Sequence, residues 1–435
     1  MKVPFPSMRL LASQVAQATG GALAGPDTEI DGASFDSRSV LAGQLFVPIV
    51  ADRDGHDFIA LALESGAGAY LTSQPPIGGT AIRVEDTGEA LMQLAAWVRG
   101  RLDIPVVGIT GSVGKTSTKD FVAAALGATL RVAANERSFN NEQGLPVTML
   151  GAPNDTEVLV VEMGMRGFGE ITRLCEVARP TIGVITAVAA SHTERVGGID
   201  GVARAKRELV EVLPEQGTAI LNADDERVAA MAGHTAAGVL TYGRAGDVRL
   251  VDVTLDELAR PRLAVETPWG RGDVQLAVSG AHMAHNAVGA IAVAGVVTGS
   301  IDGALEALAA ADVSGMRMEV AHAPSGAVIV NDAYNANPDS MRAALDAVAA
   351  MRASRRFAVL GVMAELDDPP AGHQRVMNDA LERGIDVVAV GTDLYGVRPV
   401  DDPIAALGDI GPGDVVLVKA SRAGGLERWA ETLLA

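Results

Sequence analysis

Residues 108–116 have the sequence Gly108-Ile109-Thr110-Gly111-Ser112-Val113-Gly114-Lys115-Thr116, and two valines precede them. This pattern predicts a strand that passes through a glycine-containing turn into a helix beginning near Ser117. Such a turn can present successive backbone N–H groups to a polyphosphate at the positive end of the helix. Lys115 would add a positive charge for the outer phosphates, and the Thr116 hydroxyl could bind Mg²⁺. The stretch therefore predicts a nucleotide-binding α/β domain.

The spacing of this loop departs from the strict G-x-x-x-x-G-K-[ST] motif, because Ile109 stands where the first glycine is expected. Gly111, inside the turn, is the alternative glycine. A Gly-Lys-Thr triplet alone is also compatible with an ordinary turn that carries a surface lysine. The strand before it and the helix after it favour phosphate binding.

Strand and helix patterns alternate on both sides of the loop. Strands are expected at 44–49, 69–72, 106–109, 158–161, 182–186, 218–221, 327–330, 357–360, 387–390 and 415–418, and N-terminal helices at 9–19, 57–65 and 87–101. Apolar runs separated by helices are typical of a buried parallel sheet covered on both faces. Boundaries are expected near 104–105 and 312–316. The chain therefore predicts an α/β fold with domains at 1–103, 104–313 and 314–435.

Composition excludes some classes of protein. The chain has 35 basic and 54 acidic residues among 435, a net charge of −19, whereas proteins that coat nucleic acids present basic surfaces. One bound nucleotide remains compatible with this balance. Cys175 is the only cysteine, which excludes an intrachain disulfide and suits a reducing compartment. No apolar stretch has the length of a membrane span. We expect a soluble cytoplasmic protein with no nucleic-acid partner and no membrane insertion.

Of three isolated polar residues, only Glu162 allows a functional interpretation beside a structural one. Glu162 ends an apolar run, at the carboxyl end of a predicted strand where open α/β sheets bind ligands. It could hold the same Mg²⁺ as Thr116, or it could be a solvated strand end. Taken alone, His192 fits a loop histidine and Lys206 an exposed helical lysine. An ammonium group has no lone pair to offer a metal.

Two polar clusters are candidates for ligand binding. The stretch 332–338 (Asp-Ala-Tyr-Asn-Ala-Asn-Pro) follows a predicted strand and precedes a helix that starts with proline. Asp332 beside a ribose, with Tyr334 and Asn335 beside a base, would suit a nucleotide held between two domains. A capped helix start explains the same residues equally well. Asn140 and Asn141 form the second cluster, and adjacent asparagines often mark only a turn.

Together these stretches resemble the Mur ligase family over nearly the whole chain, and within it the MurF type. The resemblance is carried by residues 34–38, 43–47, 54–59, 110–116, 140–146, 162–164, 201–206, 332–344, 373 and 418–422. The run from Tyr334 to Met341 is specific to the MurF type. The resemblance implies an N-terminal UDP-precursor-binding domain, a central P-loop ATP-binding domain and a C-terminal Rossmann-like domain.

The function implied by the resemblance is an ATP-dependent ligase of peptidoglycan synthesis. It would use ATP and Mg²⁺ to join D-alanyl-D-alanine to UDP-N-acetylmuramoyl-tripeptide through an acyl phosphate. We also expect the protein to be a monomer. The resemblance assigns ATP to Thr110, Gly111, Ser112, Gly114, Lys115, Thr116, Asn286, Arg317, Asp332, Tyr334 and Asn335. It assigns the UDP-precursor to Ser37, Arg38, Asn140 and Asn141.

The resemblance also implies two metal positions. Thr116 and Glu162 match the first, and His192 and Lys206 match the second, with Lys115, His192 and Lys206 as the catalytic residues. Lys206 matches a lysine that the family carbamylates, and a carbamate supplies the anionic oxygens that an ammonium lacks.

The sequence departs from the family pattern at three positions that line no phosphate or metal motif. Met283 stands where asparagine is usual, Val362 where aspartate is usual, and Ala420 where glycine is usual. The loop around His192 also differs, since it reads Ser-His-Thr-Glu. These departures leave two alternatives open: a related ligase with a different carboxylate or amine substrate, and a catalytically silent nucleotide-binding relative.

Overall fold

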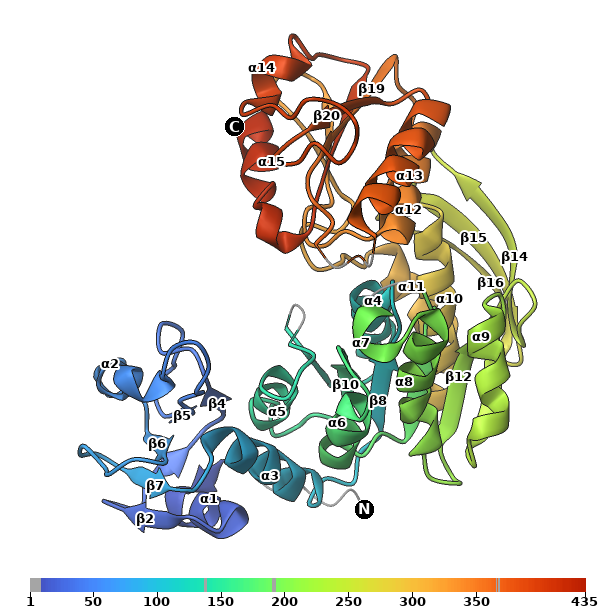
Figure 1. Cartoon of the computed structure of the whole chain (residues 1–435). Coiled ribbons are helices and arrows are strands. Elements are labelled where there is room, and N and C mark those ends of the chain that lie inside the picture. Colours follow the sequence, from blue (N-terminus) through green and yellow to red (C-terminus); the bar gives the residue numbers. More distant parts are fainter. Residues whose placement is uncertain (1–8, 137–138, 190–192, 365, 367) are drawn as a thin grey trace.

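The computed structural model describes residues 9–136, 139–189, 193–364, 366 and 368–435. Figure 1 shows three bodies in series, with the N-terminal one in blue, the central one in green and yellow, and the C-terminal one in orange and red. Each large sheet lies inside one of the three predicted segments. We therefore keep 1–103, 104–313 and 314–435 as the proposed domains.

The N-terminal domain holds a five-stranded sheet in the order β2-β7-β6-β5-β4 and a separate β1-β3 pair. Its elements are β1 (Leu10–Leu11), α1 (Ala12–Thr19), β2 (Ala22–Ala24), β3 (Glu29–Ile30), β4 (Ala33–Ser34), β5 (Leu45–Phe46), α2 (Ile59–Glu64), β6 (Ala69–Thr72), β7 (Ala81–Arg83) and α3 (Thr87–Arg99). The helix expected over 9–19 begins only at Ala12, because Leu10 and Leu11 pair with β3 as a strand.

The central domain holds a nine-stranded sheet in the order β16-β15-β14-β13-β12-β11-β8-β10-β9. Its strands are β8 (Val106–Thr110), β9 (Val132–Ala134), β10 (Val158–Glu162), β11 (Ile182–Ile185), β12 (Thr218–Asn222), β13 (Gly238–Gly243), β14 (Val248–Leu255), β15 (Pro261–Thr267) and β16 (Gly270–Gln275). In this spatial order, neighbouring strands from β14 across to β9, β8 included, pair in parallel. Strand β8, which leads into the glycine turn, lies between β10 and β11.

Helices cover both faces of this sheet, as the apolar strand pattern predicts. The helices are α4 (Lys115–Gly127), α5 (Gly144–Leu150), α6 (Glu170–Ala178), α7 (Thr193–Val196), α8 (Ile199–Glu211), α9 (Glu226–Ala229), α10 (His282–Thr298) and α11 (Asp302–Ala309). On β8, Val107 joins one core with Phe121 of α4, whereas Val106 joins another with Leu209 of α8. Alternate side chains of β8 thus anchor the strand to opposite layers.

The antiparallel extension β14-β15-β16 differs from the expected all-parallel sheet. Along β15, Leu263 and Val265 are buried whereas Arg262 is exposed. This alternation is typical of a sheet with one solvated face. Helices α10 and α11 pack against the covered side.

The C-terminal domain holds a five-stranded sheet in the order β17-β18-β21-β19-β20, parallel except for β17. Its elements are β17 (Glu319–His322), β18 (Val328–Asn331), α12 (Pro338–Ala350), β19 (Arg355–Leu360), α13 (Pro369–Glu382), β20 (Asp386–Ala389), α14 (Pro403–Leu407), β21 (Asp414–Lys419) and α15 (Glu427–Leu434). The segment that enters this domain is tied to α4, because the Ser314 N–H donates to Asp120 Oδ2 at 2.8 Å.

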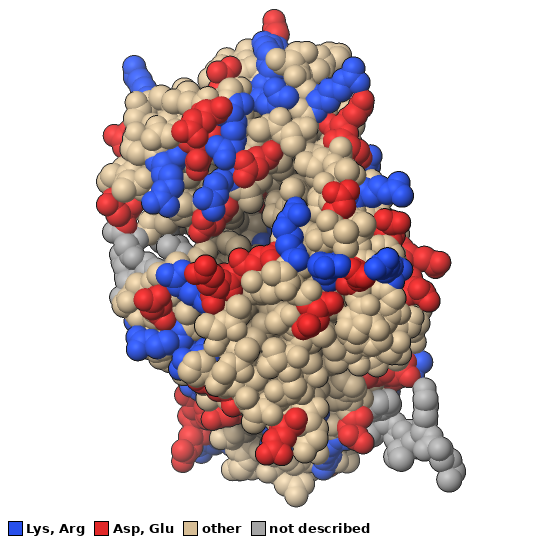
Figure 2. Space-filling view, turned by 90° about the vertical axis from the view of Figure 1, so that its right-hand side faces the viewer, with Lys and Arg blue, Asp and Glu red and all other residues tan. Residues whose placement is uncertain are grey.

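The surface combines both charge signs despite the net charge of −19. Figure 2 shows acidic and basic side chains interspersed over one face, which is hollowed where the C-terminal domain meets the central one. In the part of the chain that the structure describes, no helix combines the length and apolar character needed to cross a bilayer.

Candidate active site

A cavity of about 790 Å³ lies between the central and C-terminal domains. It is lined by residues from both, although they lie far apart in the sequence. The predicted site residues that line it are Gly111, Ser112, Gly114, Lys115, Thr116, Asn140, Asn141, Glu162, Lys206, Asn286, Arg317, Asp332, Tyr334 and Asn335. The fold thus brings most of the predicted site together in one place.

The glycine turn at one end of the cavity leaves no room for larger residues. Gly111 and Gly114 have φ angles of 155° and 81°. A Cβ on Gly111 would lie 1.9 Å from Thr186 Oγ1, and one on Gly114 would lie 2.6 Å from Asn286 Oδ1. The helix starts at Lys115, two residues before the predicted start. The first free backbone N–H groups of the helix therefore come from residues of the glycine-lysine-threonine motif itself. This geometry fits a phosphate cradle.

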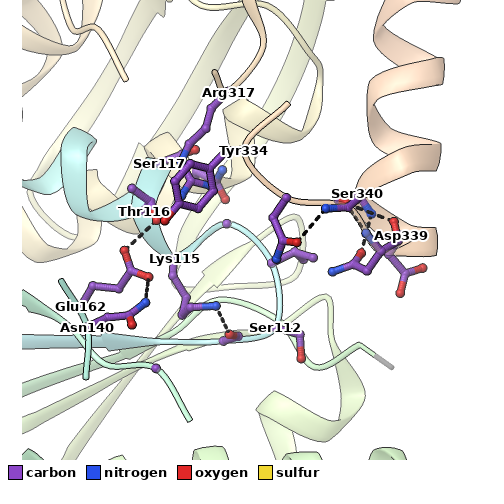
Figure 3. Close-up of a pocket in the computed structure, with 18 of the residues that line it drawn as sticks. Ser112, Lys115, Thr116, Ser117, Asn140, Glu162, Arg317, Tyr334, Asp339 and Ser340 are labelled. Carbon is purple, nitrogen blue, oxygen red and sulfur yellow. Dashed lines mark hydrogen bonds between the residues drawn. The ribbon is translucent and has the colours of Figure 1, made fainter. Parts of the chain in front are cut away.

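Residues of the turn are held by hydrogen bonds to backbone carbonyl groups. Ser112 donates through its N–H to Ala187 O at 2.8 Å and through its Oγ to Ala189 O at 3.0 Å. Lys115 Nζ donates to Gly111 O at 2.8 Å, so the lysine is folded over the turn (Figure 3). Thr110 is different from the other predicted phosphate-loop residues: it is fully buried below the turn, outside the cavity lining, and its Oγ1 donates to Met163 O.

Glu162, the last residue of β10, lies beside Thr116 in the first turn of α4 (Figure 3). Thr116 Oγ1 donates to Glu162 Oε2 at 2.6 Å, and Asn140 Nδ2 donates to Glu162 Oε1 at 2.6 Å. Glu162 is 1% exposed, so it is not a solvated strand end. Its backbone N–H donates to Asn135 Oδ1, which fixes the start of the loop that carries Asn140. The site thus holds a buried carboxylate and a hydroxyl next to the phosphate cradle.

Lys206 on α8 is 2% exposed, which overturns its interpretation as an exposed helical lysine. The helix spacing explains this, because Lys206 shares a face with Val202, Leu209 and Val210. Burial, reinforced by the nearby charge of Lys115, holds the pKa of Lys206 well below its usual range, against the opposite effect of Glu162. A neutral amine is therefore more accessible here than on an exposed lysine.

The opposite wall comes from the C-terminal domain. The Arg317 guanidinium lies over the Tyr334 ring, 4.0 Å from its centroid (Figure 3). Asp332 Oδ2 accepts a 2.6 Å hydrogen bond from Lys419 Nζ. The helix start proposed as an alternative is also present, since Asn337 caps α12 through the Ser340 N–H. The cap uses Asn337 and leaves Asp332, Tyr334 and Asn335 at the cavity.

Several cavity residues were not predicted from the sequence, and Lys419 and His282 are two titratable ones among them. Lys419 directly follows a predicted buried strand, and a charged residue there is the signal that could have found it. His282 begins α10 and lines the cavity beside Met283. Burial lowers the pKa of His282, against the opposite effect of Asp332 across the domain boundary.

Other predicted residues lie elsewhere. Ser37 is buried in the N-terminal domain, and Arg38 is exposed and pairs with Asp36 at 2.6 Å. The ring of Phe35, on the same loop, lies 5.6 Å from that of Phe139, which precedes Asn140. The loop of Ser37 therefore lies against the loop that reaches the cavity.

His192 lies outside the residues that the structure describes. Within the described ranges, no group of three or more His, Cys, Asp or Glu side chains is arranged to hold a metal.

Comparison with known proteins decides the family. A model of the Mur ligase middle domain matches residues 109–294, and a model of the Mur ligase glutamate ligase domain matches residues 316–401. A relative from Mycobacterium tuberculosis, named UDP-N-acetylmuramoyl-tripeptide–D-alanyl-D-alanine ligase, is 38% identical over 98% of both chains. The chain belongs to the Mur ligase family. The predicted resemblance is confirmed.

Solved Mur ligases share the whole architecture of this chain. A MurF from Acinetobacter baumannii has a TM-score of 0.88 at 27% identity, covering 99% of this chain and 100% of its own. A MurF ligase from Thermotoga maritima, solved in complex with ADP, has a TM-score of 0.78 at 27% identity, covering 92% and 96%. The predicted three-domain α/β fold is therefore confirmed for this Mur ligase.

Proposed function

We propose that this Mur ligase joins the carboxylate of UDP-N-acetylmuramoyl-tripeptide to the amine of D-alanyl-D-alanine and releases ADP and phosphate. The observation that carries the proposal is the end-to-end match to a relative named for that reaction. The cavity between the two domains supports it, because a phosphate cradle faces a polar wall. A ligase with other substrates and a silent relative are both less favoured, since the match extends over 98% of the chain.

The chemistry needs two substitutions in sequence. The tripeptide carboxylate attacks the γ-phosphorus of ATP, and ADP leaves with the electron pair of the broken P–O bond. The amine of the dipeptide then attacks the acyl carbon, loses a proton, and phosphate leaves. In this proposal the turn at 111–114 and Lys115 hold the phosphates, so that the chain contributes mainly position and charge.

The donors beside the cradle fit Mg²⁺. Thr116 and Glu162 supply a hydroxyl and a carboxylate 2.6 Å apart, and oxygen donors completed by phosphates are the usual environment of this ion. Bound there, Mg²⁺ would neutralise charge on the outer phosphates. Asn140 fixes the carboxylate from its other oxygen. We assign the first metal position to Thr116 and Glu162.

The second metal position is proposed for Lys206 and His192. A neutral Lys206 amine can attack CO₂ to form a carbamate and release one proton, and the lowered pKa of Lys206 favours that neutral form. The carbamate would place an anion beside Lys115, whose charge acts on Lys206. We assign His192 to this metal position from the family resemblance alone.

The remaining predicted residues divide by substrate. We assign Ser37 and Arg38 to the UDP end of the precursor, and Asn140 and Asn141 to the end that reaches the cavity. The contact between Phe35 and Phe139 supports one continuous path from the first pair to the second. We assign the nucleoside part of ATP to Asn286, Arg317, Asp332, Tyr334 and Asn335.

We further propose that the protein works as a monomer. Because ATP is a co-substrate, we further propose that the protein acts in the cytoplasm.

A substrate-dependent phosphate-release assay tests the proposal. The purified protein receives ATP, Mg²⁺, UDP-N-acetylmuramoyl-tripeptide and D-alanyl-D-alanine, and each component is left out in turn. We expect phosphate release only in the complete mixture, with a product heavier by the dipeptide minus water in mass spectrometry. Release with another amino acid or another carboxylate, and not with these, would identify a different ligase. ATP binding without release under any mixture would identify the silent relative.

A further inference from the structure

Lys419 is a buried charge at the end of the central strand of the C-terminal sheet. It is 2% exposed and is the last residue of β21, between β18 and β19. Lysine is almost never buried to this degree without a partner. Its ammonium has three N–H donors and no acceptor, so its hydrogen bonds identify the oxygen atoms that it holds in place.

Among the residues that the structure describes, the acceptors of the Lys419 ammonium belong to one short segment. Nζ donates to Asp332 Oδ2 at 2.6 Å, to Asn335 O at 2.9 Å and, more weakly, to Asp332 O at 3.4 Å. The segment 332–335 follows β18 and forms the wall of the cavity opposite the phosphate cradle. One side chain therefore holds both ends of that segment.

Asp332 is also connected to the stacked pair of Arg317 and Tyr334 on the same wall of the cavity. Asp332 Oδ1, the oxygen that Lys419 leaves free, accepts from the Met318 N–H at 3.2 Å. Met318 follows Arg317, whose guanidinium lies over the Tyr334 ring. Met318 has a φ of 51°, in the left-handed region that is costly for a non-glycine residue. The Asp332 contact thus fixes a strained backbone next to Arg317.

We propose that Lys419 is a positioning residue for ATP: it sets the carboxylate of Asp332 and the backbone of 332–335 before the nucleotide binds. This inference rests on the proposed assignment of Asp332, Tyr334 and Asn335 to the nucleoside part of ATP. Lys419 acts through Asp332 and does not take part in the chemistry. Its loss would weaken ATP binding and leave the precursor site, which lies on the other domains, unaffected.

The chain offers a matched control on the same strand. Asp414, the first residue of β21, is 3% exposed and pairs with Arg355 at the end of the strand away from Lys419. Asp414→Asn would disturb a partly buried ion pair of the same sheet without touching the segment 332–335. It reports what loss of stability alone does to ATP use.

The experiment compares Lys419→Met, Lys419→Arg and Asp414→Asn with the wild type. We expect Lys419→Met to raise KM for ATP about tenfold or more, the usual effect of losing a hydrogen bond to a charged group, with KM for the UDP-precursor within about twofold. Lys419→Arg keeps the charge but changes the length and geometry of the donor, so KM for ATP should also rise while thermal stability stays near wild type. Asp414→Asn should leave KM for ATP unchanged.

Calorimetry with ADP alone gives an independent readout that needs no turnover, and ADP should bind both Lys419 variants more weakly. The inference is overturned if Lys419→Arg binds ADP as the wild type does, or if the Lys419 variants lose only stability, as the control does. Should Lys419→Met fail to fold, the arginine variant decides. Absence of turnover in the wild type would instead count against the proposed reaction, whereas the ADP measurement would still test Lys419.

Discussion

Thr116 Oγ1 and Glu162 Oε2 are 2.6 Å apart, and both side chains are buried. The hydrogen bond joins the first turn of α4 to the end of β10. It therefore fixes the position of the carboxylate relative to the phosphate cradle. The second carboxylate oxygen is occupied by Asn140. A metal held here would therefore meet a carboxylate whose orientation is set in advance.

Glu162→Gln tests this metal position, because it keeps the size of the side chain and removes its charge. The Mg²⁺ concentration for half-maximal phosphate release should rise by about tenfold or more, since even residues behind metal ligands change affinity by that much. A Mg²⁺ titration of both proteins at saturating ATP measures the shift. An unchanged Mg²⁺ requirement would assign the pair a purely structural role.

Lys115→Ala tests the phosphate cradle. Lys115 lines the cavity and donates to Gly111 O of its own turn, so the fold should tolerate its loss. Turnover should fall about 10²-fold or more, as when one preorganised donor to a transition state is removed. Phosphate release and thermal unfolding are measured on the same preparation. Near-normal turnover by a folded variant would contradict the role.

Lys206→Ala tests the proposed carbamate. The substitution removes a buried amine whose pKa is already held down by burial, so stability should hold or increase. Turnover should fall about 10²-fold, the scale of one lost electrostatic contributor. Added acetate or formate should restore part of it by placing a carboxylate in the vacated space. Lys115→Ala is the control that these acids should not restore, and a Lys206→Ala protein with wild-type turnover would refute the assignment.

Particular residues show what the sequence could predict and what it could not. The buried parallel strands and the turn at 111–114 follow from apolar runs and glycine positions, which depend on local sequence. Lys206 was predictable in part, since its spacing from Val202 and Leu209 places it on the buried face of a helix. The partnership of Asp332 with Lys419 was not, because two strands must first pair to bring residues 87 positions apart together.

Asp414 makes the stability of the C-terminal sheet depend on pH. The hydrogen bond from Arg355 holds the pKa of Asp414 below its ordinary value of 3.8. A carboxyl group whose pKa is lowered on folding stabilises the protein fully above its unfolded pKa, and loses this contribution as pH falls through the folded value.

Asp414→Asn should therefore lower the free energy of unfolding by about 1–2 kcal/mol at pH 7, the lower part of the range for charged hydrogen bonds, because Arg355 is half exposed. The difference from wild type should shrink as pH falls below 3.8. Urea unfolding at pH 7 and at acid pH measures both. A difference that stays constant with pH would mean that the charge of Asp414 contributes nothing.

Substitution of Asp332 tests the prediction that one nucleotide contacts both the central and the C-terminal domain. It lies on the C-terminal wall of the cavity, whereas Lys115 lies on the central wall. Asp332→Ala is a poor test, because it leaves the buried ammonium of Lys419 without its carboxylate, and breaking a buried pair typically costs about 3–5 kcal/mol. Asp332→Asn keeps a side-chain oxygen that can accept from Lys419 and removes the negative charge. Its effect on ATP binding is therefore easier to distinguish from an effect on stability.

With the bridge in place, Asp332→Asn should raise KM for ATP about tenfold, the loss expected for one charged hydrogen bond, and leave KM for the UDP-precursor near wild type. Small-angle scattering should show the wild type becoming more compact with an ATP analogue and the precursor, because binding energy from both domains drives closure. The variant should close only at higher nucleotide concentration. If instead it loses stability while keeping the ATP affinity and the closure of the wild type, Asp332 serves the C-terminal domain alone and the nucleotide does not span the cavity.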